Sequence, residues 1–511
     1  MEPLLGELKR LEFVYEDTGA EEQVYVFKHV LTQEVAYGSL LHERRRALNA
    51  RTVEAIETMY ADRLAEQVDR LARHAFWGEV WDKAVAYYRQ AGAKAFARSA
   101  LREAIACFEQ ALVAVGHLPE SQERREQAID LRLDMRNALI ALGAFGAIFD
   151  HLYAAERLAV SLDDPRRLGW VSVYLSNYFC STGDQDRSVE TGQRALAIAM
   201  ASEDFALEVM ATFFLGLSYL SLGDYRQAVH YHRKNVETLT GEWLRERFGE
   251  PGLPAVFSRA FLDWGLAEFG EFAEGMVHGE EAVQIAETTV DQPFTLSHAY
   301  LGIGLLHLRK GDLPQAIAML ERGLGVCQAG DVQLLLPWVA SPLAYAYALS
   351  GRLAEALPLL EQAVEQCVAT RNMLIYPLFV AHLGEACLLA GRIADAGQQA
   401  QHALERSRDL KQRGHEAYAL RLLGEVAAQR QPPDAESAAA AYQQAMALAD
   451  ELGMRPLTAH CHLGLGTLYA RTGHLEQARA EISAAMALYR TMDMTLWLSR
   501  AEAILASAGS C

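Results

Sequence analysis

The stretch Leu215–Ala228, with the sequence LGLSYLSLGDYRQA, carries a pattern that recurs along most of the 511-residue chain. Residues that favour helices lead to the pair Gly223-Asp224, and further helix-forming residues follow it. Glycine ends a helix readily because it adopts the left-handed conformation without a Cβ penalty. The stretch therefore predicts one helix, a tight turn at Gly223 and a second helix.

Glycine turns of this kind recur with gaps of 40, 47, 41, 40, 40 and 82 residues, the last being two periods of 41. Five residues after each turn the side chain is small, and seven before it the side chain is small except at Asp263. Small residues let helix axes approach closely, and one hairpin cannot bury its apolar face alone. The pattern predicts an all-α solenoid of stacked hairpins. The turn glycines are Gly183, Gly223, Gly270, Gly311, Gly351, Gly391 and Gly473.

The small residues around each turn, with an aromatic four positions before it at Tyr219, Tyr347 and Tyr469, resemble the tetratricopeptide repeat. The period of about 40 exceeds the 34 residues of that family, so each helix should carry about one extra turn. Lengthened repeats of this type resemble those of large bacterial signalling ATPases. We expect a superhelix of about eleven hairpins.

Residues 1–60 do not follow the repeat. The runs 11–15 and 23–27 are β-prone and are separated by a polar, glycine-bearing loop, which predicts a hairpin. A fragment of a leading helix, Leu4–Leu11, precedes it, and one long helix from about Leu31 to Tyr60 should follow. A hairpin flanked by helices is typical of a winged-helix module, here in partial form.

Three runs extend the resemblance to nearly the whole chain: Tyr25–Leu41 with Glu43–Arg46, then Glu246–Arg259, then Leu452–Gly466. They are similar to a bacterial family that joins a class III adenylate/guanylate cyclase domain, a STAND-type AAA+ ATPase module and a long repeat region. The chain contains no G-x-x-x-x-G-K-[ST] motif. The resemblance implies the carboxy-terminal part of such a fusion, as a fragment, a split-gene product or a standalone paralogue.

The predicted organisation has three parts. Residues 1–60 form the partial winged-helix module, residues 61–140 carry degenerate helical repeats, and residues 141–511 form the repeat superhelix. Within the repeats, the run Gly249–Pro254 is too rich in proline and glycine to be helical and should form a loop.

Composition excludes several classes of function. The net charge is −19 at pH 7, from 47 basic and 66 acidic side chains, which disfavours binding to nucleic acid or to anionic membranes. Seven scattered cysteines without a C-x-x-C pair predict buried free thiols. No signal segment and no run of 18 apolar residues is found, so we expect a cytoplasmic protein.

The sequence shows no catalytic constellation, cofactor motif or metal-binding signature. The pairs His230/His232 and His460/His462 are two residues apart, so on a helix their side chains point away from each other. The resemblance adds one candidate, because a winged-helix histidine in STAND ATPases contacts the phosphate of bound ADP and His29 lies at the matching step. We expect His29 to sense nucleotide in trans; a histidine bonded within its own module is the alternative.

The inner, concave face of a solenoid is its usual binding surface. The repeat register places the residues six before each turn on that face, with those two before the turn beside them; Ser221, two before its turn, should face an open groove. The resulting lining mixes aromatic and polar side chains and suits an extended peptide or a partner's surface. The candidate contacts are Asn177, Trp264, Glu268, Arg309, Tyr345, Glu385, Thr467 and Arg471.

These observations predict a non-catalytic interaction or ligand-sensing arm of a bacterial signalling ATPase/cyclase system, with a protein or peptide partner and possible contact to a cognate STAND ATPase. One alternative is an enzyme whose cyclase or ATPase domains lie outside this chain. A second is the sensor domain of a transcriptional regulator, which the acidic charge and the lack of a terminal helix-turn-helix disfavour.

Overall fold

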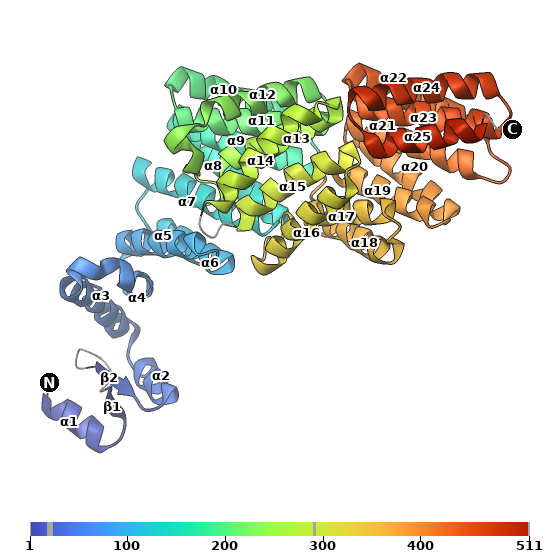
Figure 1. Ribbon diagram of the computed structural model, residues 1–511. Helices are drawn as coiled ribbons and strands as arrows, with labels where there is room; N and C mark the ends of the chain where they lie inside the picture. The colour runs from blue at the N-terminus through green and yellow to red at the C-terminus, as the bar shows by residue number, and fades with distance from the viewer. Residues whose placement is uncertain (1, 18–23, 290–292, 509–511) are drawn as a thin grey trace. The chain divides into compact units, whose positions relative to one another are not determined.

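The computed structural model describes residues 2–17, 24–289 and 293–508. The described residues form an all-α protein with one small hairpin, and they fall into two compact units that divide between Leu131 and Arg132. Figure 1 shows the helices of the larger unit running back and forth as consecutive antiparallel pairs. Each unit is described by itself.

The first unit opens with α1 (Glu2–Arg10), followed by β1 (Val14–Asp17) and β2 (Val24–Phe27), which pair antiparallel with Val14 opposite Phe27. The predicted leading helix and hairpin are therefore confirmed, although residues 18–23 of the loop lie outside the described part. The single helix expected over 31–60 is wrong. The chain forms α2 (Val30–Gly38) and α3 (His42–Met59) instead, because Gly38 weakens the helix and Ser39 donates its hydroxyl to the carbonyl of Ala36.

Four further helices follow in the first unit: α4 (Leu64–Trp77), α5 (Trp81–Ala97), α6 (Leu101–Gly116) and the first half of α7 (Gln122–Ala141), with a 3₁₀ turn at Ala61–Arg63. Successive helices pack against each other along their buried faces, which carry alanines at the contacts, such as Ala84 and Ala104. In the basic run 44–46, Arg46 pairs with Glu79 at 3.1 Å.

The second unit is built from regular hairpins. All seven turn glycines take positive φ, between 74° and 96°, so the predicted turns are confirmed. A 3₁₀ segment (Gly241–Arg245) and the predicted loop precede α13. The helices are α8 (Phe145–Leu162), α9 (Pro165–Thr182), α10 (Gln185–Ser202), α11 (Phe205–Leu222), α12 (Tyr225–Thr238), α13 (Pro254–Phe269), α14 (Phe272–Glu287), α15 (Pro293–Lys310), α16 (Leu313–Ala329), α17 (Leu336–Leu349), α18 (Leu353–Thr370), α19 (Tyr376–Leu389), α20 (Ile393–Asp409), α21 (Arg413–Gln429), α22 (Ala435–Leu452), α23 (Arg455–Arg471), α24 (Leu475–Thr491) and α25 (Thr495–Ala508).

The small residues lie where two helices touch. A Cβ on Gly216 would come within 2.7 Å of the His232 ring, and one on Gly304 within 2.6 Å of Leu320. At Asp263 the small residue lies on the other helix of the pair. Gly279 on α14 faces Asp263 on α13, and a Cβ on Gly279 would lie 2.8 Å from the Asp263 carboxylate.

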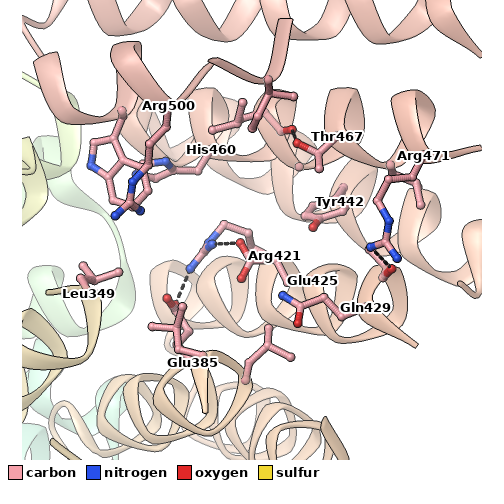
Figure 2. Close-up of a pocket in the computed structure, with 18 of the residues that line it drawn as sticks. Leu349, Glu385, Arg421, Glu425, Gln429, Tyr442, His460, Thr467, Arg471 and Arg500 are labelled. Atoms are coloured by element: carbon pink, nitrogen blue, oxygen red, sulfur yellow. Dashed lines mark hydrogen bonds and ion pairs between the residues drawn. The ribbon is translucent and has the colours of Figure 1, made fainter. Parts of the chain in front are cut away.

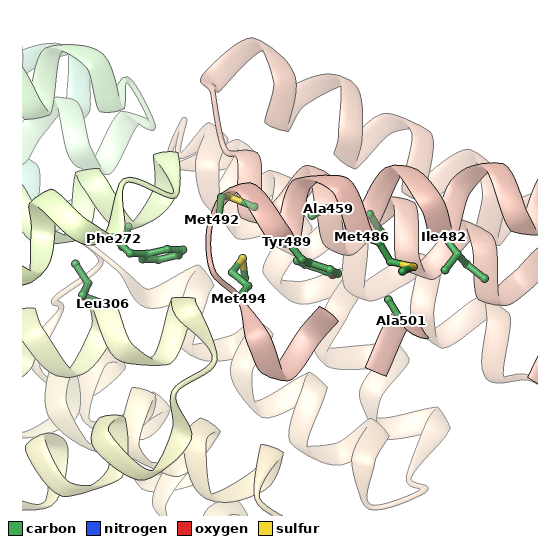
Figure 3. Close-up of a cluster of buried hydrophobic side chains, with 11 residues drawn as sticks. Phe272, Leu306, Ala459, Ile482, Met486, Tyr489, Met492, Met494 and Ala501 are labelled. Atoms are coloured by element: carbon green, nitrogen blue, oxygen red, sulfur yellow. The ribbon is translucent and has the colours of Figure 1, made fainter. Parts of the chain in front are cut away.

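Later hairpins of the second unit return to earlier ones, through pairs 150 to 225 residues apart in sequence. Lys310 pairs with Asp493 at 2.7 Å and Arg455 with Glu271 at 3.0 Å. Figure 3 shows a buried cluster at this contact, where Phe272 on α14 packs toward the methionines between α24 and α25. We call this contact between distant hairpins the seam.

The seam corrects one expectation. Ser221 does not face an open groove; it is buried, accepts a hydrogen bond from Gln185 and donates one to the carbonyl of Leu374, 153 residues away. The repeat register predicts that Ser221 faces the inner side of the solenoid. The sequence of a single repeat does not reveal which distant hairpin covers that side.

One described helix, α11, is long and apolar enough to cross a membrane, but 72% of it is buried inside the protein, as in a core helix. Six cysteines are described, and all are free thiols. Five of them are buried, as expected, and Cys107 is partly exposed. Burial raises the pKa of the Cys180 and Cys367 thiols to about 12.

Candidate ligand-binding site

A cavity of about 660 Å³ lies among the first helices of the last repeats, with residues from α17, α19, α21, α23 and α25 in its walls. Its size falls within the range of about 300–1,000 Å³ that is typical of ligand pockets. The helices come from a span of more than 150 residues, so the cavity exists only when the hairpins are stacked. Figure 2 shows its side chains.

Paired charges form the floor of the cavity. Arg421 on α21 makes ion pairs with Glu385 on α19 and with Glu425 one turn further along α21. Tyr345 on α17 donates its hydroxyl to the same Glu385 carboxylate. Burial raises the pKa of Glu425, in opposition to the nearby Arg421. These contacts fix the relative positions of three helices, although the Nε of Arg421 is buried without a hydrogen-bond partner among the described residues.

Two further arginines are differently placed. Arg471 on α23 donates to the carbonyl of Ala428 at 2.7 Å, and Arg500 on α25 stacks over the Trp497 ring at 4.8 Å from its centroid. Among the described residues, neither guanidinium makes an ion pair. In Figure 2 they lie on opposite sides of the cavity, with Arg421 between them.

The remaining wall is apolar and comes from α17, α19 and α20. Leu349, Leu388, Leu389 and Ile393 line it, and Leu389 is 49% exposed. The cavity therefore has an apolar surface, which includes the half-exposed Leu389, and a charged surface beside it. The site can therefore hold a ligand with both apolar and polar parts.

The structure divides the eight groove candidates into two groups. Tyr345, Glu385, Thr467 and Arg471 line the cavity. The others are buried in the protein's own packing. Arg309 pairs with Glu268 at 3.1 Å, Tyr418 donates to the same carboxylate at 2.6 Å, Trp264 is 3% exposed, and Asn177 accepts a hydrogen bond from Arg136 at 2.5 Å.

Several residues of the site escaped the sequence reasoning. Glu425 lies 40 residues after Glu385, so the repeat period could have found it, but its hairpin has Gln431-Pro432 where the others have glycine. Arg500 stands in the last helix, which has no following turn to set a register. Outside the cavity, the buried pair Arg136–Glu250, at 3.0 Å, joins α7 to the loop before α13 and also had no sequence signal.

Of the histidines named from the sequence, His460 lines the cavity. His29 caps the start of α2 in an extended conformation, is exposed, and makes no side-chain capping hydrogen bond. The two H-x-H pairs do not converge: His460 lies 2.8 Å from the Tyr489 hydroxyl, whereas His462 pairs with Glu481 at 2.6 Å. Among the described residues, no three His, Cys, Asp or Glu side chains gather around a possible metal position.

Comparisons with known proteins agree with this architecture at the level of the repeat. The tetratricopeptide repeat family model matches residues 337–362 and 459–483, which begin on α17 and α23 and run into the helices that follow. The repeats are tetratricopeptide-like. No curated protein gives a significant sequence match.

Solved structures resemble the fold at low identity. A Rap protein complexed with Competence and Sporulation Factor aligns with a TM-score of 0.48 and 16% identity, over 72% of this chain and 98% of that one. NprR in complex with its cognate peptide NprX gives 0.47 and 14%, over 72% and 99%. A signal transduction ATPase with a tetratricopeptide repeat sensor from Pyrococcus horikoshii gives 0.41 and 11%; the match covers 74% of this chain and 55% of the ATPase. These values say nothing about what this chain binds.

Proposed function

We propose that this chain is a non-catalytic interaction arm that binds a segment of a partner protein or peptide in the cavity between α17 and α25. The observation that carries the proposal is the cavity itself, which has an apolar wall and, on opposite sides, Arg471 and Arg500, whose guanidinium groups make no ion pair among the described residues. Ligand pockets in general combine apolar side chains with a few polar groups that fix the orientation of the ligand.

The charged floor supports a positioning role over a catalytic one. General acid–base catalysis needs a group within hydrogen-bond reach of the substrate and free to exchange its proton. Here Arg421 engages both Glu385 and Glu425, and Tyr345 donates to Glu385. The floor therefore holds the helices at fixed spacing while the ligand contacts the groups above it.

The proposal is tested by blocking the cavity. Peptides of 12 random residues are selected by display on the full chain, and their affinities are measured by calorimetry. Thr467 lines the cavity, so Thr467→Trp should weaken the selected peptides at least about tenfold, or 1.4 kcal/mol. Thr238→Trp, at an exposed position on α12, is the control and should leave affinity unchanged. Equal affinities in both variants would exclude the cavity as the binding site.

We further propose that the amino-terminal hairpin and α2 contact a STAND nucleotide domain supplied by another chain, with His29 near the bound phosphate. The supporting observation is an exposed apolar surface around His29, where Val30 is 69% and Leu31 70% exposed. Large exposed apolar residues in a contiguous group mark interaction sites. This contact would connect the interaction arm to an ATPase.

The test uses the nucleotide domain encoded nearest to this chain's gene, purified with ADP and mixed with the full chain. His29→Ala should speed ADP release from the mixture, because a phosphate contact is lost. His42→Ala, an equally exposed histidine on the next helix, should have no effect. ADP release that is unchanged by His29→Ala would remove the histidine's role.

A further inference from the structure

We infer that the ligand of the cavity is an acidic peptide segment, in which two carboxylates flank apolar residues and bind Arg471 and Arg500. The inference rests on the proposed function and names the chemistry of its ligand. It follows from which charged side chains of the cavity already have partners within the protein and which do not.

Arg421 is not available to a ligand. Its guanidinium contacts the carboxylates of Glu385 and Glu425, and its side chain is 8% exposed. Each of its two terminal nitrogens donates to one carboxylate, and its Nε is buried without a hydrogen-bond partner among the described residues, so a ligand in the cavity does not reach it. One guanidinium faces two carboxyl groups, so this cluster carries at most one net negative charge, and burial reduces that charge by raising the pKa of Glu425. The two positive charges of Arg471 and Arg500 outweigh it.

Arg471 and Arg500 keep donors free for a ligand. Arg471 uses one N–H group on the Ala428 carbonyl, out of the five that a guanidinium carries. Arg500 lies over the Trp497 ring, with its Cζ 4.8 Å from the ring centroid, and its guanidinium makes no hydrogen bond or ion pair among the described residues. Both side chains are exposed and can reach a ligand, and each is therefore suited to bind a carboxylate through charge-assisted hydrogen bonds.

The position of the two arginines sets the shape of the ligand. They lie on opposite sides of the cavity in Figure 2, and the neutralised Arg421 lies between them. The apolar wall at Leu349, Leu389 and Ile393 faces the same space. A segment with one acidic residue at each end and apolar residues between them matches this order. The chain's net charge of −19 would repel such a segment elsewhere, so the two arginines give local specificity.

The experiment sequences the display-selected 12-residue peptides described above and measures their affinities for variants of the full chain. We expect enrichment of Asp and Glu among the selected peptides. Arg471→Gln and Arg500→Gln should each weaken binding about tenfold, and the double variant about a hundredfold. Binding by the parent chain should weaken with added salt, and this dependence should flatten in the double variant.

The matched control removes two arginines outside the cavity. Arg406 and Arg479 lie on α20 and α24 and each pairs with an acidic residue one turn away on its own helix. The double variant Arg406→Gln/Arg479→Gln changes the net charge equally and should leave affinity within about twofold. Circular dichroism of all variants checks that the helices remain.

The outcomes separate the inference from the proposal on which it rests. Acidic peptides that bind the arginine variants as tightly as the parent chain would overturn the inference. Neutral or basic peptides whose binding is lost in Thr467→Trp would overturn it as well, while the proposed function stands. Peptides that bind independently of Thr467→Trp, or a selection that yields no binder, would overturn both.

Discussion

At the scale of single residues, His232 stands where other repeats use aliphatic side chains. Leu320, Leu360 and Ile482 occupy the corresponding places, each 16 residues after a small residue. His232 is fully buried between aromatic rings, and neither ring nitrogen has a hydrogen-bond partner in the part of the chain that the structure describes. A buried polar group without a partner costs about 1–3 kcal/mol. We predict that His232→Leu raises the free energy of unfolding by about 1 kcal/mol at pH 7, measured by urea denaturation; a lower value would show that the histidine is satisfied.

His232 should also make the free energy of unfolding depend on pH. Burial lowers the pKa of His232 to about 3, from 6.5 in the unfolded chain. The unfolded state therefore binds more protons between pH 6.5 and 3, and the folded state loses stability as the pH falls through this window. The difference in the free energy of unfolding between His232→Leu and the parent chain should therefore grow by up to about 1.4 kcal/mol for each pH unit below 6.5. Denaturation at pH 7.5, 6 and 5 tests this, and a difference that does not change with pH would contradict it.

Residue-level packing was partly readable from the sequence. The repeat register identified the small residues at the helix contacts, including Gly216. It marked Asp263 as an exception but not the compensating Gly279, because Gly279 lies nine residues after its turn, outside the positions at which the repeat places small residues. The prediction that Ser221 faces an open groove was wrong for a related reason. Ser221 is buried by a hairpin 153 residues away, and such a contact leaves no local signal in the sequence.

At the scale of elements, the seam makes a glycine on one helix sensitive to a residue far away in sequence. A Cβ on Gly414 of α21 would lie 2.0 Å from the Tyr225 hydroxyl at the start of α12. We predict that Gly414→Ala destabilises the chain by about 1–3 kcal/mol through overpacking. Gly397→Ala on α20, where the nearest atom is Val426 at 3.5 Å, is the matched control and should be neutral or stabilise by up to about 1 kcal/mol.

A double variant identifies the cause. If Tyr225 is the obstacle, Gly414→Ala should cost much less in a Tyr225→Leu background, and thermal unfolding would show strongly non-additive effects. Additive effects would mean that α12 and α21 do not touch, and the seam would be contradicted.

Element order shows where local reasoning reached its limit. The hairpin, the turns and the loop before α13 were predicted, since glycine, proline and β-prone runs act locally. The break between α2 and α3 was missed because a run with helical periodicity continues across Gly38-Ser39. Half of the groove candidates line the cavity, and Glu425 would have joined them by period alone. The domain limits at 60 and 140 stay predictions.

At the scale of the whole molecule, the proposed function is binding without catalysis. ATP hydrolysis and nucleotide cyclisation need bound Mg²⁺ and stabilisation of charge on the transferring phosphorus. The sequence contains no phosphate-binding loop for these tasks. We predict that the purified full chain neither hydrolyses ATP nor forms cyclic AMP or cyclic GMP, measured by phosphate release and chromatography. Activity that co-purifies with the chain through two further columns would overturn the prediction.

The place of binding is the central claim, and photo-crosslinking tests it most directly. A display-selected peptide carrying one benzophenone group at its centre is irradiated with the full chain, and the crosslinked residues are identified by mass spectrometry. The account predicts adducts on the apolar wall and the inner helices, at residues such as Leu389, Leu463 and Ile504. Adducts confined to helices that contribute no residue to the cavity, such as α16, α18 and α24, or to residues 2–131, would contradict it.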